Sequence, residues 1–306
     1  MSTKYKILVL DGGGSKGVYT LGVLKELEMK LGSPLYNHFD LIYGTSTGSI
    51  IGALIGLGYS IQDIKDLYFT IIPKIMIPGT AKGKSRALRE ESIKVFESKK
   101  FDSFLTNIGI VALNHDTQCP LIFKTDIRLA HGMKQSFKAG FDQLISTAVR
   151  CSCSAYPFFE KMEIYTEQHG NIEVVDGGFI ANNSTLYSIV DATMALKLNE
   201  SDLHILNVGV GTYVPIRRKG LKARLFRLFG FFQFVEKVLT ASTNSNSTIA
   251  KLLFRKANYL RVSESFPDPE LATDMFEYDG LKLEKLYSLG KRSYAKFESD
   301  IVELLK

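Results

Sequence analysis

The sequence predicts an α/β fold around a mainly parallel β-sheet, and three observations support this prediction. A short apolar run rich in β-forming residues leads into a glycine-rich turn and then a helical pattern. The same unit occurs a second time directly afterwards, and further apolar runs alternate with helical patterns along the chain. Two strands joined through a helix require a right-handed crossover, which makes them parallel and places ligands at their carboxyl ends. We therefore expect both glycine turns at one edge of the sheet.

The first unit starts with the apolar run at 5–10 and continues into a helix at 15–31, where leucines recur three or four residues apart. The second unit starts with the run at 39–43, which is followed by the sequence GTSTGS. An apolar segment punctuated by glycine then predicts a buried helix at 50–57. These two units begin the predicted sheet.

The remaining predicted strands are short apolar runs: 108–113, 121–124, 162–166, 172–175, 203–210 and 259–262. The remaining predicted helices carry apolar residues at helical spacing: 141–150, 186–198, 221–239 and 281–305. The polar tract TASTNSNST at 240–248 predicts a mobile connection or the start of a helix. We expect a single domain over 1–306, with its functional motifs at 6–211 and a helical part, regulatory or membrane-contacting, at 212–306.

Composition excludes several classes of protein. The chain has 306 residues, of which 45% are hydrophobic and 23% charged, so it can bury a core and is not a disordered or collagen-like chain. Lys and Arg exceed Asp and Glu by 38 − 32 = 6, and this excess favours anionic partners such as anionic lipid or nucleic acid. We expect a cytoplasmic protein, because no apolar run has the length of a signal peptide core or a membrane span.

Cysteine usage predicts neither disulfides nor a metal site. Cys119, Cys151 and Cys153 are too few for a disulfide framework, and no CxxC pair or histidine pair completes a set of metal ligands. We therefore expect structural thiols.

The first glycine turn, DGGGSKG at 11–17, allows two interpretations. Its glycines form a GxGxxG pattern between a strand and a helix, which is typical of dinucleotide-binding folds. That interpretation requires an acidic residue at the end of the next strand, and no residue fills this position well. Alternatively, the consecutive residues Gly12, Gly13 and Gly14 expose backbone N–H groups beside a helix N-terminus, where they can stabilise an oxyanion.

The second glycine turn has the sequence GxSxG, which is typical of a nucleophile elbow. Ser46 lies at its centre with Thr47 beside it, and Gly44 and Gly48 provide the positions where side chains would collide. The turn lies between a predicted strand and a predicted helix, as the elbow requires. Ser46 is therefore the predicted nucleophile.

A serine hydroxyl needs a base, and the chain offers two arrangements. The order Ser46, Asp176, His204 matches the catalytic triad of α/β-hydrolases, but His204 falls within an apolar strand pattern rather than a loop. In the second arrangement Asp176 acts on Ser46 directly. It ends a predicted strand in the sequence VVDGG, where Gly177 and Gly178 permit close backbone packing, and burial would have to raise its basicity.

Together these motifs resemble the patatin-like phospholipases, which are serine lipid acyl hydrolases with a Ser/Asp dyad. DGGGSKG is similar to their glycine-rich oxyanion motif, GTSTG to their elbow and DGG at Asp176 to their dyad motif, and the three occur in the family's order. SCSAYPFF at 152–159 and ILNVGVGT at 205–212 are similar to two further family segments, so the resemblance covers about 6–211.

The resemblance implies a three-layer α/β/α sandwich and an acyl-enzyme on Ser46, with Asp176 handling the proton. It also implies an oxyanion held by Gly12, Gly13 and Gly14, and no metal or cofactor. Lys16 and Gly17 belong to the first motif, and Lys16 is expected either to contact lipid phosphate or the loop, or to be a solvated cation. The sequence departs from the family at Cys151 and Cys153, where relatives often have small residues.

The segment 215–235 predicts a basic amphipathic helix that lies on an anionic bilayer. A core-packing helix with solvated cations is the alternative. The apolar positions of this helix share one face, and its cations have no acidic partner nearby: Arg217, Arg218, Lys219, Lys222, Arg224 and Arg227. Some bacterial relatives are antiviral effectors activated by cyclic dinucleotides, and a basic carboxyl-terminal part is compatible with such an anionic activator.

The sequence therefore predicts a phospholipase that is peripherally bound to phospholipid membranes, uses no metal or cofactor, and is compatible with activation by a cyclic dinucleotide. We do not expect a nucleic acid polymer as partner. Two alternatives stay open at this stage. One is a soluble ester or thioester hydrolase with the same dyad, and the other is a nucleotide-binding module that uses the Gly12–Gly17 turn.

Overall fold

The computed structural model describes residues 4–129, 138–167, 170–216 and 227–306, and for 227–233 it describes the backbone only. The strands have these bounds: β1 Tyr5–Leu10, β2 Leu41–Thr45, β3 Asn107–Asn114, β4 Cys119–Lys124, β5 Met162–Thr166, β6 Gly170–Asp176, β7 Leu203–Val208, β8 Thr212–Tyr213, β9 Asn258–Val262 and β10 Ser265–Phe266. The α-helices have these bounds: α1 Gly17–Leu31, α2 Thr47–Gly56, α3 Ile61–Met76, α4 Ala81–Phe96, α5 Ile145–Cys153, α6 Gly178–Ala181, α7 Thr185–Val190, α8 Arg227–Leu253 and α9 Gly280–Leu305.

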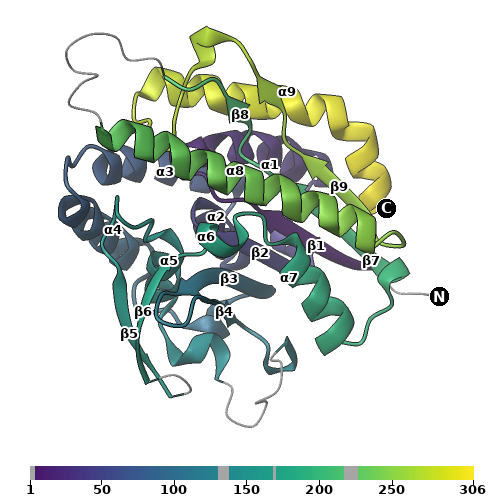
Figure 1. The fold of residues 1–306 in the computed structure, drawn as a ribbon. Coiled ribbons are helices and arrows are strands. Elements are labelled where there is room, and N and C mark those ends of the chain that lie inside the picture. The colour runs from purple at the N-terminus through teal and green to yellow at the C-terminus, as the bar shows by residue number, and fades with distance from the viewer. Residues whose placement is uncertain (1–3, 130–137, 168–169, 217–226) are drawn as a thin grey trace.

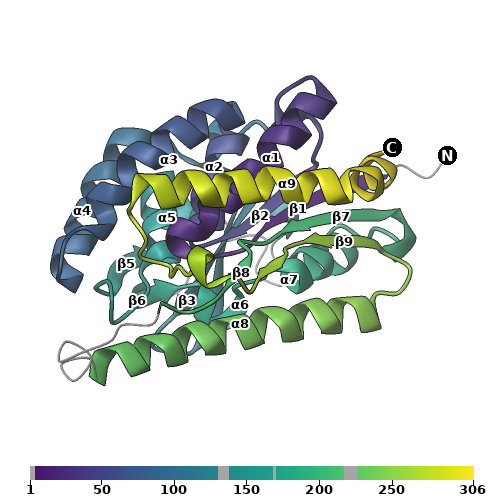
Figure 2. The same ribbon diagram turned by 90° about the horizontal axis from the view of Figure 1, so that it is seen from above.

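A central sheet organises the fold, in the strand order β5-β6-β3-β2-β1-β7-β9, with β4 also paired to β3. The strands β3, β2, β1, β7 and β9 run parallel, whereas β4 and β6 are antiparallel to β3 and β5 is antiparallel to β6. Helices cover both faces, so the molecule has three layers (Figures 1 and 2). The prediction of a three-layer α/β/α fold with a mainly parallel sheet is confirmed.

Two hydrophobic cores lie on opposite faces of the sheet, because successive side chains of a strand point to opposite sides. On β1, Leu8 and Leu10 face the core formed with α1 to α5 and α9, whereas Ile7 and Val9 face the core formed with α6, α7 and α8. All four side chains are fully buried, which explains why this strand is continuously apolar rather than alternating. The sheet is therefore rigidly held between its helical layers.

The structure corrects some predicted elements. The tract at 240–248 is neither a connection nor a helix start, because it lies in the interior of α8. The helix predicted at 141–150 begins later, at Ile145. The structure also contains α3 and α4, which the sequence analysis did not predict as helices. The basic residues from Arg217 to Arg224 lie outside the described residues.

None of the helices in the described residues combines the length and the apolar composition needed to cross a membrane.

Candidate active site

Ser46 occupies a strained turn between β2 and α2. Its backbone has φ 53° and ψ −124°, a conformation that non-glycine residues rarely adopt and that is typical of functional sites. Close backbone packing explains the two flanking glycines. A Cβ atom on Gly44 would lie 2.4 Å from the carbonyl oxygen of Gly48, and one on Gly48 would lie 2.2 Å from that of Leu10. The predicted elbow geometry is therefore present.

The pairing of β3 with its two neighbours brings Asp176 to Ser46. Thr45 at the end of β2 pairs with Val111, and Asp176 at the end of β6 pairs with Ala112 from the other side. The Ser46 hydroxyl donates a hydrogen bond of 2.8 Å to Oδ2 of Asp176. The other carboxylate oxygen, Oδ1, accepts a 2.7 Å hydrogen bond from the backbone N–H of Gly178, which fixes the carboxylate plane. A Cβ on Gly177 would lie 2.1 Å from the Val111 carbonyl oxygen, so only glycine fits there.

Burial changes the acidity of Asp176. Desolvation raises the pKa of this carboxyl to about 7, and the hydrogen bonds from Gly178 and Ser46 oppose the rise. A free aspartate has a pKa near 4 and is a weak base at neutral pH. The raised pKa therefore matches the requirement for a general base that works near neutral pH.

His204 is not part of this site. It lies at the start of β7 and pairs in register with Lys6 at the start of β1, whereas Ser46 follows the opposite, carboxyl end of the parallel strands. Its Nδ1 lies 2.6 Å from the carbonyl oxygen of Leu304, and the ring is buried. The triad arrangement is therefore wrong for this fold, and His204 is a strand histidine with a satisfied hydrogen bond.

The first glycine turn lies against the elbow. A Cβ on Gly12 would lie 3.1 Å from the Ser46 side chain. The N–H of Gly12 already donates to the Asn182 carbonyl oxygen at 3.1 Å, which corrects the expectation that Gly12 is an oxyanion donor. The N–H groups of Gly13 and Gly14 have no acceptor among the described residues. Two of the three predicted donors are thus available beside the nucleophile.

Side chains from distant elements hold this turn in place. The Tyr68 hydroxyl on α3 contacts Thr47 and donates to the Gly14 carbonyl oxygen at 2.7 Å, so it links the elbow to the turn. Asn182 donates to the Gly12 carbonyl oxygen at 3.3 Å and to Thr243 on α8 at 2.9 Å. Sequence reasoning missed these residues, because no local pattern shows which distant polar side chain reaches a turn.

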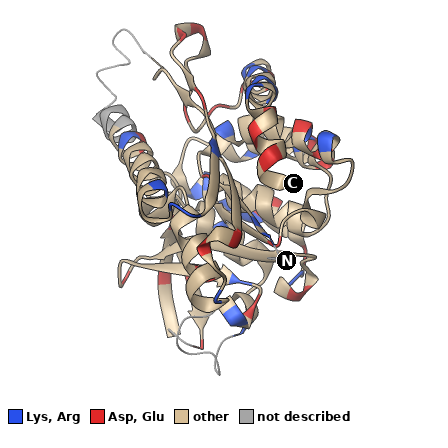
Figure 3. Cartoon of the chain, turned by 90° about the vertical axis from the view of Figure 1, so that its right-hand side faces the viewer, with Lys and Arg blue, Asp and Glu red and all other residues tan. Residues whose placement is uncertain are grey.

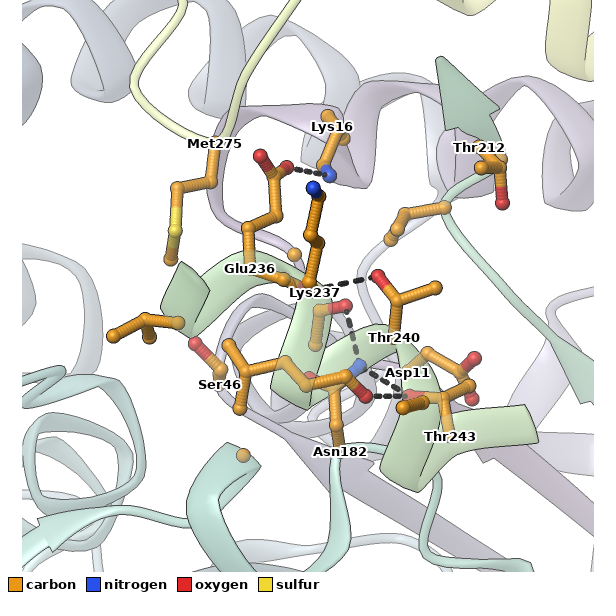
Figure 4. Close-up of a pocket in the computed structure, with 18 of the residues that line it drawn as sticks. Asp11, Lys16, Ser46, Asn182, Thr212, Glu236, Lys237, Thr240, Thr243 and Met275 are labelled. Carbon is orange, nitrogen blue, oxygen red and sulfur yellow. Dashed lines mark hydrogen bonds and ion pairs between the residues drawn. The ribbon is translucent and has the colours of Figure 1, made fainter. Parts of the chain in front are cut away.

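Lys16 is not a solvated cation. Its Nζ lies 2.6 Å from a carboxylate oxygen of Glu236, so the glycine turn is joined to α8 by an ion pair at the mouth of the site (Figure 4). Gly17 packs against Thr47 at the start of α2, where a Cβ would lie 2.5 Å from the threonine hydroxyl. Lys16 and Gly17 therefore hold the glycine turn against α8 and α2, respectively.

Ser152, in the predicted SCSAYPFF segment, supports the elbow from below. Its hydroxyl oxygen accepts a 2.8 Å hydrogen bond from the Ser46 backbone N–H and donates to the Val111 carbonyl oxygen at 2.6 Å. Cys153, which departs from the family pattern, is buried among the residues that line the apolar cavity described below. This segment therefore shapes the site although none of its residues is a predicted catalytic group.

A buried polar network anchors the start of the glycine turn. The carboxylate of Asp11 accepts a 2.7 Å hydrogen bond from Asn207 and forms a 2.7 Å ion pair with Arg261 on β9. Burial raises the pKa of Asp11, and Arg261 and Asn207 oppose this rise. Arg261 lies far beyond the predicted motifs, so sequence reasoning gave no signal for it.

We expect Arg261→Gln to lower the free energy of unfolding by about 3–5 kcal/mol, because it leaves the Asp11 carboxylate buried without its cation. Urea denaturation at neutral pH measures the loss. The double variant Asp11→Asn, Arg261→Gln removes both charges and is expected to recover more than half of it. Equal stability of the single and double variants would show that the ion pair does not anchor the turn.

Two cavities meet at Ser46. The larger, of about 380 Å³, has a mixed lining, in which α8 contributes polar side chains and apolar surface predominates. The smaller, of about 30 Å³, is almost wholly apolar and lies between the elbow and the helices α3 and α4. Its aliphatic lining includes Ile50, Ile72, Ile75, Met76 and Leu88. The nucleophile therefore lies between a larger cavity of mixed lining and a small apolar cavity.

The described residues contain one cluster of possible metal ligands, His115, Asp116 and Glu173. The Nζ of Lys161 lies 2.7 Å from a carboxylate oxygen of Glu173, so a lysine ammonium group already pairs with this cluster. None of the three residues lines either cavity at Ser46.

The chain is similar to known phospholipases. The family model of patatin-like phospholipase matches residues 8–189, which include both glycine turns and Asp176. The chain is 45% identical to a cUMP-AMP-activated phospholipase of Escherichia coli, covering 98% of this chain and 93% of that protein. It is 25% identical to a cGAMP-activated phospholipase of Vibrio cholerae, covering 95% of this chain and 90% of that protein.

Solved structures share the fold at low identity. Human GIVD cytosolic phospholipase A2 aligns with a TM-score of 0.53 and 9% identity, over 99% of this chain and 60% of that one. VipD from Legionella pneumophila aligns with a TM-score of 0.50 and 12% identity, over 97% of this chain and 67% of that one. At these identities the likeness shows the fold alone.

The family match confirms the predicted enzyme class, a serine ester hydrolase of the phospholipase type. The structure does not favour the alternative of a nucleotide-binding module built on the Gly12–Gly17 turn, because that turn packs on the Ser46 elbow. The family model spans more than half of the chain, and a relative of similar length shares 45% identity. The chain therefore belongs to the patatin-like phospholipase family, as its motifs predict.

Proposed function

We propose that this enzyme cleaves acyl ester bonds of membrane glycerophospholipids through an acyl-enzyme on Ser46, with Asp176 as the base. The observation that carries the proposal is the 2.8 Å hydrogen bond from the Ser46 hydroxyl to a buried carboxylate whose pKa is raised to about 7. Nucleophile and base are already in hydrogen-bond contact, which is the geometry that nucleophilic catalysis requires.

In the first half of the reaction, Oγ of Ser46 attacks the ester carbonyl carbon while its proton moves to Oδ2 of Asp176. The carbonyl oxygen becomes an oxyanion that the N–H groups of Gly13 and Gly14 can bind beside the N-terminus of α2. Collapse of this intermediate breaks the ester bond, and the proton on Asp176 passes to the departing lysophospholipid oxygen. The acyl group stays on Ser46.

In the second half, a water molecule attacks the acyl-enzyme carbonyl and gives a proton to Asp176. Collapse of the second tetrahedral intermediate releases the fatty acid and returns the proton to Oγ of Ser46. Asp176 therefore acts as base and then as acid in each half-reaction, and it returns to its ionised form at the end of each.

The two cavities suggest how the substrate lies. The small apolar cavity can take the first carbons of the acyl chain, and the larger cavity, with polar side chains from α8 on one side, can take the glycerol and headgroup. Bulk added to the apolar cavity should therefore discriminate against long chains.

We expect Ile75→Phe, which adds volume to this cavity, to reduce kcat/KM for a p-nitrophenyl octanoate relative to the acetate by about tenfold, the usual size of a steric effect of this kind. Ile93→Phe on the exposed side of α4 makes the same change outside the cavity and serves as control. An unchanged octanoate-to-acetate ratio in Ile75→Phe would place the acyl chain elsewhere.

We propose in addition that a cyclic dinucleotide activates the enzyme. The support is the similarity to two phospholipases that are named for such activation, over nearly the full length of each. Peripheral contact with the phospholipid membrane is part of the same proposal, since the substrate is a membrane lipid. We also propose that the whole chain acts as one domain, because residues beyond the motif region, such as Glu236 and Arg261, contact the glycine turn.

Fatty acid release from mixed phospholipid vesicles tests this function. The assay uses the native chain and Ser46→Ala, each with and without a panel of cyclic dinucleotides. Ser46-dependent release that requires one nucleotide supports both parts of the proposal, and release without nucleotide contradicts the activator alone. No release in any assay, together with hydrolysis of a soluble ester or thioester, would favour the alternative of a non-lipid substrate.

A further inference from the structure

The helix α8 has an unusual distribution of side chains. Its buried side in the described turns carries small and mostly polar residues, Thr243, Ser247 and Ala250. Its solvent side carries large apolar residues: Phe234 is 62% exposed, Val238 48%, Ile249 38% and Leu252 57%. A surface helix normally has the opposite arrangement, with its apolar residues facing the core.

Four of the five large apolar residues that the described turns of α8 expose share one face of the helix, and the fifth, Leu253, follows Leu252 at the end of the helix. The four on this face follow one another at intervals of four, eleven and three residues, which correspond to one, three and one helical turns. We call this row, Phe234, Val238, Ile249 and Leu252, the outer stripe of α8. Exposed Ala241 and Ser245 lie on the same face between Val238 and Ile249, so the outer stripe consists of two large apolar residues at each end. Exposed apolar clusters of this kind mark an interaction surface.

Charge around the outer stripe has a single sign. Between residues 234 and 253 the only acid is Glu236, and it is turned inward onto Lys16. Lys237 and Lys251 are exposed, and Arg255 follows directly after the helix. The cartoon in Figure 3 shows more basic than acidic positions along the described part of this helix. The outer surface of α8 is thus apolar and basic.

The stripe also lies beside the entrance to the active site. Lys237, Thr240 and Asn244, on the flank of α8, line the larger cavity, which also contains Ser46. Figure 4 shows Lys237 and Thr240 from α8 around the same space as Ser46. A partner seated on the outer stripe would therefore adjoin the cavity mouth.

We infer that the outer stripe of α8 docks on an anionic phospholipid bilayer. The apolar side chains would enter the boundary between headgroups and acyl chains, and the neighbouring cations would contact lipid phosphates. This inference rests on the proposed function, since the bilayer is also the substrate. The charge pattern favours lipid over a second copy of this chain, whose own stripe would bring cations against cations.

The double variant Phe234→Asp, Leu252→Asp tests the inference. Both side chains are exposed and neither lines a cavity, so the fold and the chemistry at Ser46 are expected to persist. The matched control is Leu105→Asp, Ile127→Asp, which changes two similarly exposed aliphatic residues away from α8. Three readouts are compared: cosedimentation with phosphatidylglycerol-containing vesicles, fatty acid release from them, and hydrolysis of the soluble ester p-nitrophenyl butyrate.

We expect the α8 variant to lose at least about 30-fold in vesicle affinity and in vesicle hydrolysis, because two apolar contacts with the bilayer are replaced by charges. Its hydrolysis of the soluble ester should equal that of the native chain, and the control should match the native chain in all three readouts. Lys251→Gln, Arg255→Gln should weaken vesicle binding at low salt and have less effect at high salt.

Unchanged vesicle binding by the α8 variant would overturn the inference. A change in the sedimentation coefficient of the lipid-free protein, with vesicle binding unchanged, would also overturn it and assign the stripe to contact between copies. Failure of the proposed function looks different: the native chain would then bind vesicles through α8 and release no fatty acid from them.

Discussion

Ser46→Ala should reduce fatty acid release from phospholipid vesicles by at least about 10³-fold, since removal of a catalytic nucleophile costs this much or more in serine hydrolases. The physical reason is that alanine has no oxygen to form the acyl-enzyme, while Asp176 and the glycine turn remain in place. Chromatographic quantification of released fatty acid, under the conditions in which the native chain is active, measures the effect.

Ser49→Ala is the matched control for this prediction. Ser49 lies one turn further along α2, is fully buried, and donates its hydroxyl to the Ser46 carbonyl oxygen rather than to a substrate. The same chemical change there should leave most of the activity. If Ser46→Ala kept the activity and Ser49→Ala lost it, the nucleophile would be assigned wrongly.

Asp176→Asn should also abolish turnover, by at least about 10³-fold, because an amide cannot take the proton of Ser46. In the native chain, kcat/KM should rise with pH as the carboxyl ionises and reach a plateau above its pKa of about 7. The residual activity of Asp176→Asn should lack this step. A pH–rate profile measured on a soluble ester, which avoids effects of pH on the bilayer, tests both statements.

Asp176→Asn should also stabilise the folded protein at high pH. The pKa of Asp176 is raised from 3.8 to about 7 by folding, so the folded state prefers the protonated form. The carboxyl therefore contributes stability at low pH that is lost as pH rises through the folded pKa. We expect the gain in Tm of Asp176→Asn over the native chain to grow up to about pH 7 and then to level off. A constant difference in Tm would contradict the raised pKa.

His204→Ala is the control for the identity of the base. The ring lies at the amino ends of the parallel strands and contacts the Leu304 carbonyl oxygen, so its removal should leave most of the activity. Loss of activity in His204→Ala, together with normal activity in Asp176→Asn, would reassign the enzyme to the triad class.

Local patterns in the sequence were sufficient to predict the centre of the site. The glycines around Ser46 and Asp176 are required because a side chain there would clash with neighbouring backbone at the strand ends. They therefore form short sequence motifs that can be recognised without knowledge of the fold. The parallel strands were predictable for a similar reason, because β1 is buried on both faces and reads as a continuous apolar run.

Residues that act through tertiary contacts could not be predicted in this way. Arg261 and Glu236 reach the glycine turn from β9 and α8, more than 200 residues away along the chain. The Gly12 N–H has an acceptor only because Asn182 packs against it. The tract at 240–248 looked like a connection because it is almost entirely polar. In the fold, Thr240, Thr243 and Asn244 line the cavity at Ser46, where a helix can place polar side chains against polar partners.

The most direct test of the account is to map the adduct that a fluorophosphonate probe leaves on the native chain, by mass spectrometry of its peptides. We predict a single adduct on Ser46, absent from Ser46→Ala and formed much more slowly in Asp176→Asn. An adduct on another residue, or fatty acid release by a chain that the probe does not modify at Ser46, would contradict the Ser46 and Asp176 dyad.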